Sequence, residues 1–528
     1  MKTTFIKNIA FTAALALGVL GCTDDLDQVP RYEDTSANIY KDFGNYKSIL
    51  AKAYSGLALT GSQGPEGNPD IKGGNEGFSS YLRQYWQLQE LSTDEAVISW
   101  TDAGLPNLHS MDWTSTNQFV EALYYRIFYQ VAICNEFIRE TTDGKLSERG
   151  ITGANLEEAK HYRAEVRFLR ALSYWHAIDL YGSVPFVTET DEVGSFFPKQ
   201  ISRADLFAYL ESELTAIENE LVPARQNEYA RADQAAAWTL LTKLYINAEV
   251  YTGQARYTEA ITYAKKVIDA GYTLEENFEH NFLADNDQSS EVIFPVASDG
   301  LRIQSYGGMN YILKGPIPRS KNVEYGIDAG WSGPRATKNM VDLFPPLGSG
   351  IDEREMFFTE GYTLEINSVA SETDGYPIIK FKNITSAGQP GSHVIFVDTD
   401  FPMFRLADVY LLYAEAVLRN GQGGSRSEAL GYVNDLRERA YNNTNGNITD
   451  GQLTLDFIID ERGRELASEA VRRTDLIRFG RFTEDTYLWP WKGGVKDGRG
   501  VESYRKLYPI PQSDLIANPN LDPKLNGY

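Results

Sequence analysis

Apolar side chains recur at steps of three and four residues along most of this chain, a spacing that is typical of amphipathic helices. Similar patterns predict a first helix at 46–60 and further helices at 117–141, 156–181, 203–221, 232–251, 257–270, 404–419, 427–441 and 455–467. The clearest of these faces, in 117–141, carries Phe119, Leu123, Ile127, Val131 and Cys134. The chain is therefore expected to be mainly helical.

Several of these helices follow one another as pairs joined by short turns. In the pair at 232–270, Trp238, Leu241 and Tyr245 stand at offsets of zero, three and seven. This matches the tetratricopeptide pattern except that Thr242 replaces its glycine. Because each pair buries its apolar face only by stacking on the next, the pattern predicts one helical-repeat block. This block is expected mainly at 117–272 and 404–482.

Between the helical segments the texture changes to loops rich in glycine, proline and asparagine. These stretches lie mainly at 61–115 and 298–400, and they predict an irregular lobe. Short β-type runs at 292–295, 378–382 and 394–397 predict a few strands. Loops this long inside a compact protein are usually functional.

The N-terminus has the pattern of a lipoprotein signal. Lys2 and Lys7 precede an apolar run at 9–20, which is too short for a stable membrane span and ends in Gly21-Cys22. Acylation of the Cys22 thiol would hold the protein on a membrane surface. The alternative is an ordinary signal peptide with a chance cysteine. The expected organisation is a signal peptide at 1–21, an acidic tether at 22–45 and a single domain at 46–528.

Composition narrows the classes of partner. The formal charge of −23 argues against nucleic acid and against anionic lipid. After residue 22 the sequence contains no apolar stretch long enough to cross a bilayer. Cys134 is the only other cysteine, so no intrachain disulfide can form if Cys22 is lipidated. Cys134 lies in an apolar helical pattern and is expected to be a buried, inert thiol.

Motifs for catalysis are absent from the sequence. It has no phosphate-binding glycine loop after a strand, no metal-type histidine pair and no cysteine cluster. A carboxylate pair for glycoside hydrolysis stays open as an alternative, because 73 acidic residues are present. Asp285 and Asp287 place oxygens at alternate positions as calcium loops do, but Ser290 and Val296 replace the glycine and glutamate of an EF-hand. These residues favour a solvated turn over a calcium site.

Three aromatic side chains stand out in the loops. Trp100, Tyr306 and Trp331 are flanked by small or polar residues, so few neighbours are available to bury them. The flat C–H faces of sugar rings stack on such side chains. The alternative is that these rings anchor the loops.

Taken with the lipoprotein start, several motifs resemble the SusD/RagB family of outer-membrane glycan-binding lipoproteins. They are the stretches 164–172, 460–466, 472–480, 508–511 and 518–521. The resemblance covers nearly the whole chain and implies four tetratricopeptide-like helix pairs packed against an irregular lobe. It also implies non-catalytic glycan binding on the outer face of the outer membrane and delivery to a SusC-like TonB-dependent transporter.

Within this family the chain is most similar to starch-binding members, through the contexts 75–77, 93–95, 306–308 and 487–494. That similarity implies an aromatic arc for an α-1,4-glucan, formed by Trp100, Tyr306 and Trp331, with polar contacts from Arg83, Asn75 and Glu76. One departure is Ala103, where the starch binder has an amide. With this similarity, a structural calcium at Asp285 and Asp287 is as well supported as the solvated turn. The remaining alternatives are a different glycan, a lipid-anchored glycoside hydrolase, and a helical scaffold or peptide binder.

Overall fold

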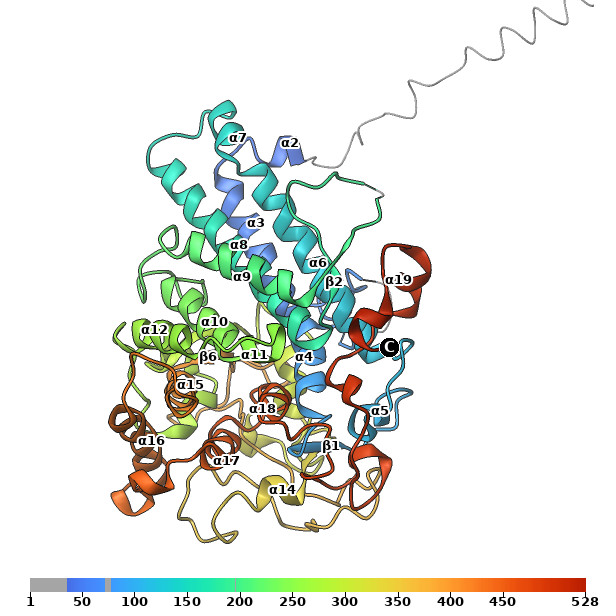
Figure 1. Cartoon of the computed structure of the whole chain (residues 1–528), viewed down its shortest axis with the longest axis vertical. Coiled ribbons are helices and arrows are strands. Elements are labelled where there is room, and N and C mark those ends of the chain that lie inside the picture. The colour runs from blue at the N-terminus through green and yellow to red at the C-terminus, as the bar shows by residue number, and fades with distance from the viewer. Residues whose placement is uncertain (1–35, 72–76, 195) are drawn as a thin grey trace, which may run out of the picture.

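The computed structural model describes residues 36–71, 77–194 and 196–528, and its fold is mainly helical (Figure 1). The helices are α2 (Ser36–Ile39), α3 (Gly44–Ala58), α4 (Tyr81–Glu90), α5 (Pro106–Ser110), α6 (Gln118–Glu140), α7 (Asp143–Glu148), α8 (Ala154–Leu180), α9 (Arg203–Ile217), α10 (Gln234–Ile246), α11 (Ala248–Thr252), α12 (Tyr257–Ile268), α13 (Gly308–Lys314), α14 (Lys338–Val341), α15 (Leu406–Leu418), α16 (Arg426–Tyr441), α17 (Leu455–Leu466), α18 (Arg472–Arg478) and α19 (Gln512–Ala517). The strands are β1 (Ala96–Ile98), β2 (Val184–Pro185), β3 (Gln200–Ile201), β4 (Val292–Val296), β5 (Pro334–Ala336) and β6 (Phe401–Arg405).

Most of the long helices form one continuous stack. Helix α6 packs on α8, α8 on α9, α10 on α12, α12 on α15, and α15 on both α16 and α17. In Figure 1, α3, α6, α8 and α9 occupy the upper half, and α10, α12, α15, α16 and α17 lie below them. This stacking buries the apolar stripe of each helix against its neighbours, as expected for helical repeats. The predicted fold class, stacked helix pairs against an irregular lobe with a few short strands, is confirmed.

Helix ends follow from local sequence. The Asn117 side chain accepts hydrogen bonds from the backbone N–H groups of Phe119 and Val120, at 3.0 and 3.3 Å, and so begins α6. Ser425 and Glu428 form a reciprocal capping box at the start of α16. The five apolar residues predicted to share one face of α6 are all buried. Among them, Cys134 is a free thiol whose pKa burial raises to about 12.

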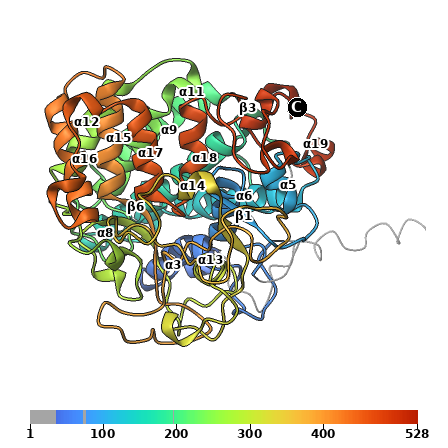
Figure 2. The ribbon, with the colours of Figure 1, turned by 90° about the horizontal axis from the view of Figure 1, so that it is seen from below.

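The irregular lobe is joined to the helical stack by short antiparallel ladders. Strand β1 pairs with β5, and β4 pairs with β6, which leads directly into α15. Figure 2 shows the segment of residues 300–400 gathered on one side of the molecule, with α12, α15, α16, α17 and α18 on the other. None of the helices in the described part of the chain combines the length and apolar character needed to cross a membrane.

Arginine and glutamate side chains form a network inside the protein, where the lobe meets the stack. Arg405, the last residue of β6, contacts Glu291 and Glu465 at 2.7 Å each. Burial alone would raise the pKa of Glu461, but the guanidinium groups of Arg354, Arg464 and Arg437 lower it to about 2. The acidic members on α17 belong to the 460–466 motif, so that motif is part of the framework. We call this the buried ion cluster: Glu291, Arg354, Arg405, Arg439, Glu461 and Glu465.

Three boundaries differ from the sequence predictions. The tether predicted to reach residue 45 ends earlier, because Tyr40 is buried and its ring packs 5.3 Å from that of Tyr46. The 61–115 stretch is not irregular throughout, since it contains the buried helix α4. The helix predicted at 232–251 divides into α10 and α11 at Asn247, whose side-chain amide bonds back to the carbonyl of Lys243 at 3.0 Å.

Two predicted strands, at 378–382 and 394–397, do not form. Their backbone N–H groups are satisfied by scattered partners and not by one neighbouring strand. The N–H of Ile379 bonds to the Met356 carbonyl at 2.8 Å, and that of Val397 bonds to the Asn310 side chain at 2.9 Å. The run at 292–295 is confirmed as β4 because a continuous partner, β6, lies beside it.

Candidate functional site

Two of the predicted aromatic residues meet at one end of the β1–β5 ladder. The N–H of Ser99 bonds to the Gly333 carbonyl at 3.1 Å, and the Ser99 hydroxyl bonds to the Ser332 carbonyl at 2.8 Å, so the two chains stay paired beyond the strands. This pairing brings Trp100 and Trp331 together, with ring centroids 6.3 Å apart and planes inclined at 45°. Both side chains are half-buried. We call them the tryptophan pair.

The Trp100 ring lies directly on the backbone of Gly333. A Cβ atom at Gly333 would stand 2.9 Å from two carbon atoms of the indole, closer than carbon atoms pack without displacement. The glycine is therefore required by close approach. The run of small residues beside Trp331, which on sequence alone suggested exposure, instead makes room for the other tryptophan.

Helix α13 supports the tryptophan pair through two of its side chains. The Tyr311 ring contacts Trp100 edge-on, with centroids 5.8 Å apart. The ammonium group of Lys314, at the end of α13, lies 5.3 Å from the Trp331 centroid and pairs with Asp328. A cation over a ring contributes about 0.5–2 kcal/mol, more when it is shielded from water. Packing and charge thus hold both indoles in place before any ligand arrives.

Arg83 extends this arrangement on the other side of Tyr311. Nine of the ten residues of α4 are buried, and Arg83 is the half-buried exception. Its guanidinium lies 4.5 Å from the Tyr311 centroid, and its Nε has no hydrogen-bond partner among the described residues. Burial lowers the pKa of Arg83, and Tyr311 and Asp102 oppose that shift. Arg83 therefore lies one ring away from the tryptophan pair, and its buried Nε is left unsatisfied among the described residues.

Tyr306 lies at the opposite end of α13 from Lys314. The helix between them has seven residues, or about 10 Å of axial rise. The Tyr306 hydroxyl donates a hydrogen bond to Glu66 at 2.5 Å, and its ring packs 5.2 Å from that of Phe396. The structure thus brings Trp100 and Trp331 together beside α13 and places Tyr306 just before the start of that helix.

Three other predicted residues, Cys22, Asn75 and Glu76, lie outside the described residues. Asp285 accepts hydrogen bonds from the backbone N–H and hydroxyl of Ser386, and Asp287 is exposed. In the part of the chain that the structure describes, no group of three or more histidine, cysteine, aspartate or glutamate side chains is arranged to hold a metal. Two carboxylates fall short of the six to eight oxygens that calcium takes, so they do not make a site by themselves. A calcium ion at Asp285 and Asp287 stays a prediction.

Comparison with known proteins places this architecture. The family model described as SusD family matches residues 349–528. Over 99% of both chains, the protein is 36% identical to the starch-binding protein SusD of Bacteroides thetaiotaomicron. This chain belongs to the SusD family. It is also 24% identical to a SusD-like protein of Bacteroides ovatus, over 99% of this chain and 98% of that one.

Solved structures share the fold. The surface glycan-binding protein A of Bacteroides thetaiotaomicron, in complex with laminarihexaose, aligns with a TM-score of 0.69 at 20% identity, covering 91% of this chain and 99% of that one. Members of the SusD family bind carbohydrate without catalysing a reaction, so this chain is a binding protein and not an enzyme.

Sequence reasoning missed the residues that support the tryptophan pair. Tyr311 and Lys314 fall in the stretch predicted to be irregular, where the structure instead has α13, and Glu66 reads as one of many loop carboxylates. One signal was available: Tyr311 and Lys314 are three residues apart, a spacing that places them on one face of a helix. Where that face lies relative to the two tryptophans depends on the pairing of β1 with β5. Strands of three residues are too short for this pairing to be predicted from the sequence.

Proposed function

We propose that this protein binds starch and maltooligosaccharides, the α-1,4-glucans, at the cell surface without cleaving them. The observation that carries the proposal is the tryptophan pair, two preorganised rings in a family of carbohydrate-binding proteins. The similarity over the full chain to a relative named as starch-binding supports the choice of glucan.

The geometry of the pair suits a curved ligand. The planes of Trp100 and Trp331 are inclined at 45°, so together they form a bent platform and not a flat one. A helical α-1,4-glucan turns along its length, and successive glucose rings stack on successive indoles without straining the sugar. Because packing already fixes the indoles, binding loses little side-chain entropy. Tyr306 extends the platform along α13 as the third ring of the arc.

Polar contacts complete the proposed site. Arg83 is proposed to donate from the terminal nitrogens of its half-buried guanidinium to sugar hydroxyl groups, and Asn75 and Glu76 are proposed to add further contacts. Ala103 cannot supply the side-chain amide of the starch binder, which removes a hydrogen bond of about 0.5–1.5 kcal/mol. A few stacking contacts and hydrogen bonds predict weak affinity, about 10–100 μM or weaker.

The N-terminal pattern and the family support a proposal for attachment and delivery. We propose that acylated Cys22 anchors the protein to the outer membrane facing the exterior, and that a SusC-like TonB-dependent transporter receives the bound glycan. Metabolic labelling with a clickable palmitate analogue tests the anchor. Label that is present in the wild type and missing from Cys22→Ala supports it, and equal labelling of both contradicts it.

Retention on insoluble starch tests the binding itself. The wild type should be depleted from solution by starch granules, and the double variant Trp100→Ala/Trp331→Ala should remain in solution. A reducing-end assay on the same mixture separates binding from hydrolysis, because a rise with time would contradict a non-catalytic role. Laminarin is the competitor to include, since the structural relative above holds laminarihexaose. Release of the protein from the granules by less laminarin than maltoheptaose would identify a different glycan.

A further inference from the structure

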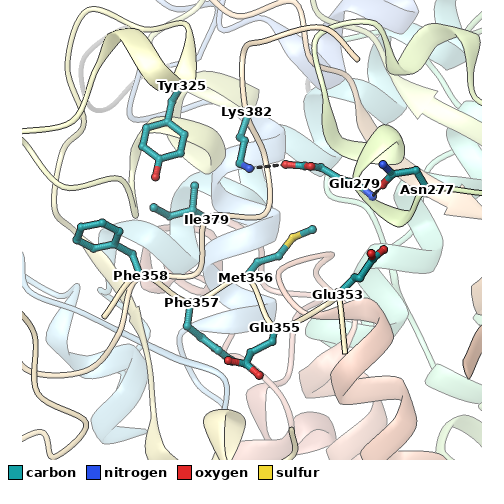
Figure 3. A pocket seen from close by; sticks show the side chains of 10 residues that line it. All are labelled: Asn277, Glu279, Tyr325, Glu353, Glu355, Met356, Phe357, Phe358, Ile379 and Lys382. Carbon is teal, nitrogen blue, oxygen red and sulfur yellow. Dashed lines mark hydrogen bonds and ion pairs between the residues drawn. The ribbon is translucent and has the colours of Figure 1, made fainter. Parts of the chain in front are cut away.

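The irregular lobe contains a second pocket that the proposed function does not use. It has a volume of about 410 Å³ and lies between the 3₁₀ turn η3 (Val323–Tyr325), the segments 353–358 and 379–382, and the start of η1 (Phe278–Phe282). This volume falls within the range of about 300–1,000 Å³ found for small-molecule sites. Figure 3 shows the side chains that line it.

The two sides of this pocket differ in chemistry. In Figure 3, the rings of Tyr325 and Phe358 lie on one side, and Glu279, Asn277 and Glu353 lie on the other. Such a division, with aromatic faces opposite hydrogen-bonding groups, suits a ligand with one apolar face and a polar edge. We call it the Tyr325–Phe358 pocket.

The charge of the pocket restricts the ligand further. Its lining carries three glutamates, Glu279, Glu353 and Glu355, and one lysine, Lys382, which leaves a net formal charge of −2. Lys382 pairs with Glu279, so its charge is already compensated. The two remaining carboxylates disfavour an anionic ligand such as an acidic or sulfated sugar. They accept hydrogen bonds from hydroxyl or ammonium groups.

Glu355 has a vacant acceptor in this lining. Its Oε1 accepts the backbone N–H of Gly348 at 2.7 Å, but its buried Oε2 has no hydrogen-bond partner among the described residues. A buried acceptor without a donor is costly, and a ligand that supplies the donor recovers that cost. Figure 3 shows the Glu355 carboxylate at the edge of the lining, beside Phe357, so this unsatisfied acceptor lies at the rim of the pocket.

We propose that the Tyr325–Phe358 pocket is a second saccharide site, which takes a neutral or amine-bearing sugar residue and excludes acidic ones. The proposal rests on the proposed function for the class of ligand, and on the lining of the pocket for its location and charge preference. A pyranose stacks its C–H face on Phe358 and Tyr325 and donates from its hydroxyl groups to Glu355 and Glu353.

One loop connects the two sites. Trp331 and Tyr325 are six residues apart, and the N–H of Gly330 bonds to the carbonyl of Lys321 at 3.2 Å, which folds the loop back on itself. The Lys321 ammonium group lies 5.5 Å from the centroid of Phe358. A polysaccharide chain long enough to reach both sites would gain effective affinity from the second contact.

Saturation-transfer difference NMR on the Trp100→Ala/Trp331→Ala protein tests this proposal, because the tryptophan pair is disabled there. Maltose and glucosamine should still give difference signals, and glucuronic acid should give none. Adding Phe358→Ala should weaken maltose binding about tenfold, the equivalent of one lost stacking contact. Glu355→Gln keeps the shape of the pocket and should weaken glucosamine more than maltose.

Val323→Ala is the matched control, because this exposed side chain lies on the same η3 turn and does not line the pocket. It should leave all the signals unchanged, and thermal melting should show that each variant is folded. The proposal is overturned if the double tryptophan variant gives no signal with either sugar, or if Phe358→Ala and Glu355→Gln leave the signals unchanged. If the double variant still gives signals but the wild type is not retained on starch, the proposal for this pocket stands and the proposed function is refuted.

Discussion

The buried ion cluster and the tryptophan pair use opposite physical means in the same chain. The cluster takes charged side chains out of water and satisfies each with several partners, as Glu465 does with Arg354 and Arg405. The tryptophan pair leaves two apolar rings half-exposed and holds them with α13. The first arrangement joins the irregular lobe to the helical stack, and the second is the surface proposed to contact the ligand.

This difference separates what family membership establishes from what it leaves open. Two motif stretches that carry the resemblance, 460–466 and 472–480, supply the buried charges of α17 and α18. They specify the framework, whereas the tryptophan pair is proposed to bind the ligand. Most of the proposed ligand residues lie on short ladders and loops, where a single substitution such as Ala103 is proposed to change the contacts without disturbing the fold. The framework and the ligand preference should therefore respond to different mutations.

The largest effect is expected from Arg405→Met. This change removes the cation that contacts Glu291, Glu465 and Glu469 together and leaves Arg439 on the first two, and removing one partner of a buried ion pair costs about 3–5 kcal/mol. The free energy of unfolding from urea titration should fall by that amount, while the folded protein binds maltoheptaose as before. Arg302→Met, at a side chain that is 85% exposed, is the control and should change stability by less than about 0.5 kcal/mol. Equal losses in the two variants would contradict a structural role for the cluster.

Acid should unfold the framework through the same cluster. The folded pKa of Glu461 lies near 2, below its unfolded value, so the carboxylate stabilises the fold above about pH 4.5 and loses this contribution as the pH falls toward 2. Linkage puts the loss on the order of 3 kcal/mol. Urea titrations between pH 6 and about pH 3 should show a shallower decline for Glu461→Gln than for the wild type. Parallel declines would show that Glu461 does not carry the effect.

Trp100→Ala should sharpen the contrast from the other side. A central aromatic contact carries about 2 kcal/mol or more of binding, so maltoheptaose affinity should fall roughly 30-fold or below detection. The urea midpoint should shift less than in Arg405→Met, because the ring is half-buried. Phe197→Ala, at an exposed ring in the loop between β2 and β3, should leave binding unchanged. Unaltered affinity in Trp100→Ala would remove the tryptophan pair from the site.

The smallest effect expected is that of Gly333→Ala. The added methyl group displaces the Trp100 ring, so affinity should fall about three- to tenfold, with a stability loss near 1 kcal/mol. Gly431→Ala in α16 is the matched control, because its added Cβ meets open space. It should raise the free energy of unfolding by about 0.5–1 kcal/mol and leave affinity unchanged. If both substitutions left affinity unchanged, the position of the Trp100 ring would not matter for binding.

The helices could be predicted closely from the sequence, because long segments with a regular apolar face have few other ways to bury it. α6, α12 and α16 begin and end within a few residues of the predicted bounds. The strands could not, since a run such as 378–382 becomes a strand only when a distant segment lies beside it. The same limit applies to charge: Glu461 and Arg462 read as a polar helix face, and only the tertiary packing shows them buried.

The candidate site was partly predictable. Trp100, Tyr306 and Trp331 were marked by their loop contexts and by the family resemblance, and the structure pairs two of them. Tyr311 and Lys314 show only the three-residue spacing of one helix face, and Gly333 shows no local signal, because each holds the pair through a contact made across the fold. The Tyr325–Phe358 pocket likewise draws on segments that are far apart in sequence.

Isothermal titration of the wild-type protein with maltoheptaose and with cellohexaose tests the central claim most directly, because the two ligands share their sugar and differ in curvature. The bent platform of the tryptophan pair predicts measurable heat and saturable binding for maltoheptaose, with little or no heat for the straight cellohexaose. Equal heats and equal affinities for the two would contradict selection by curvature.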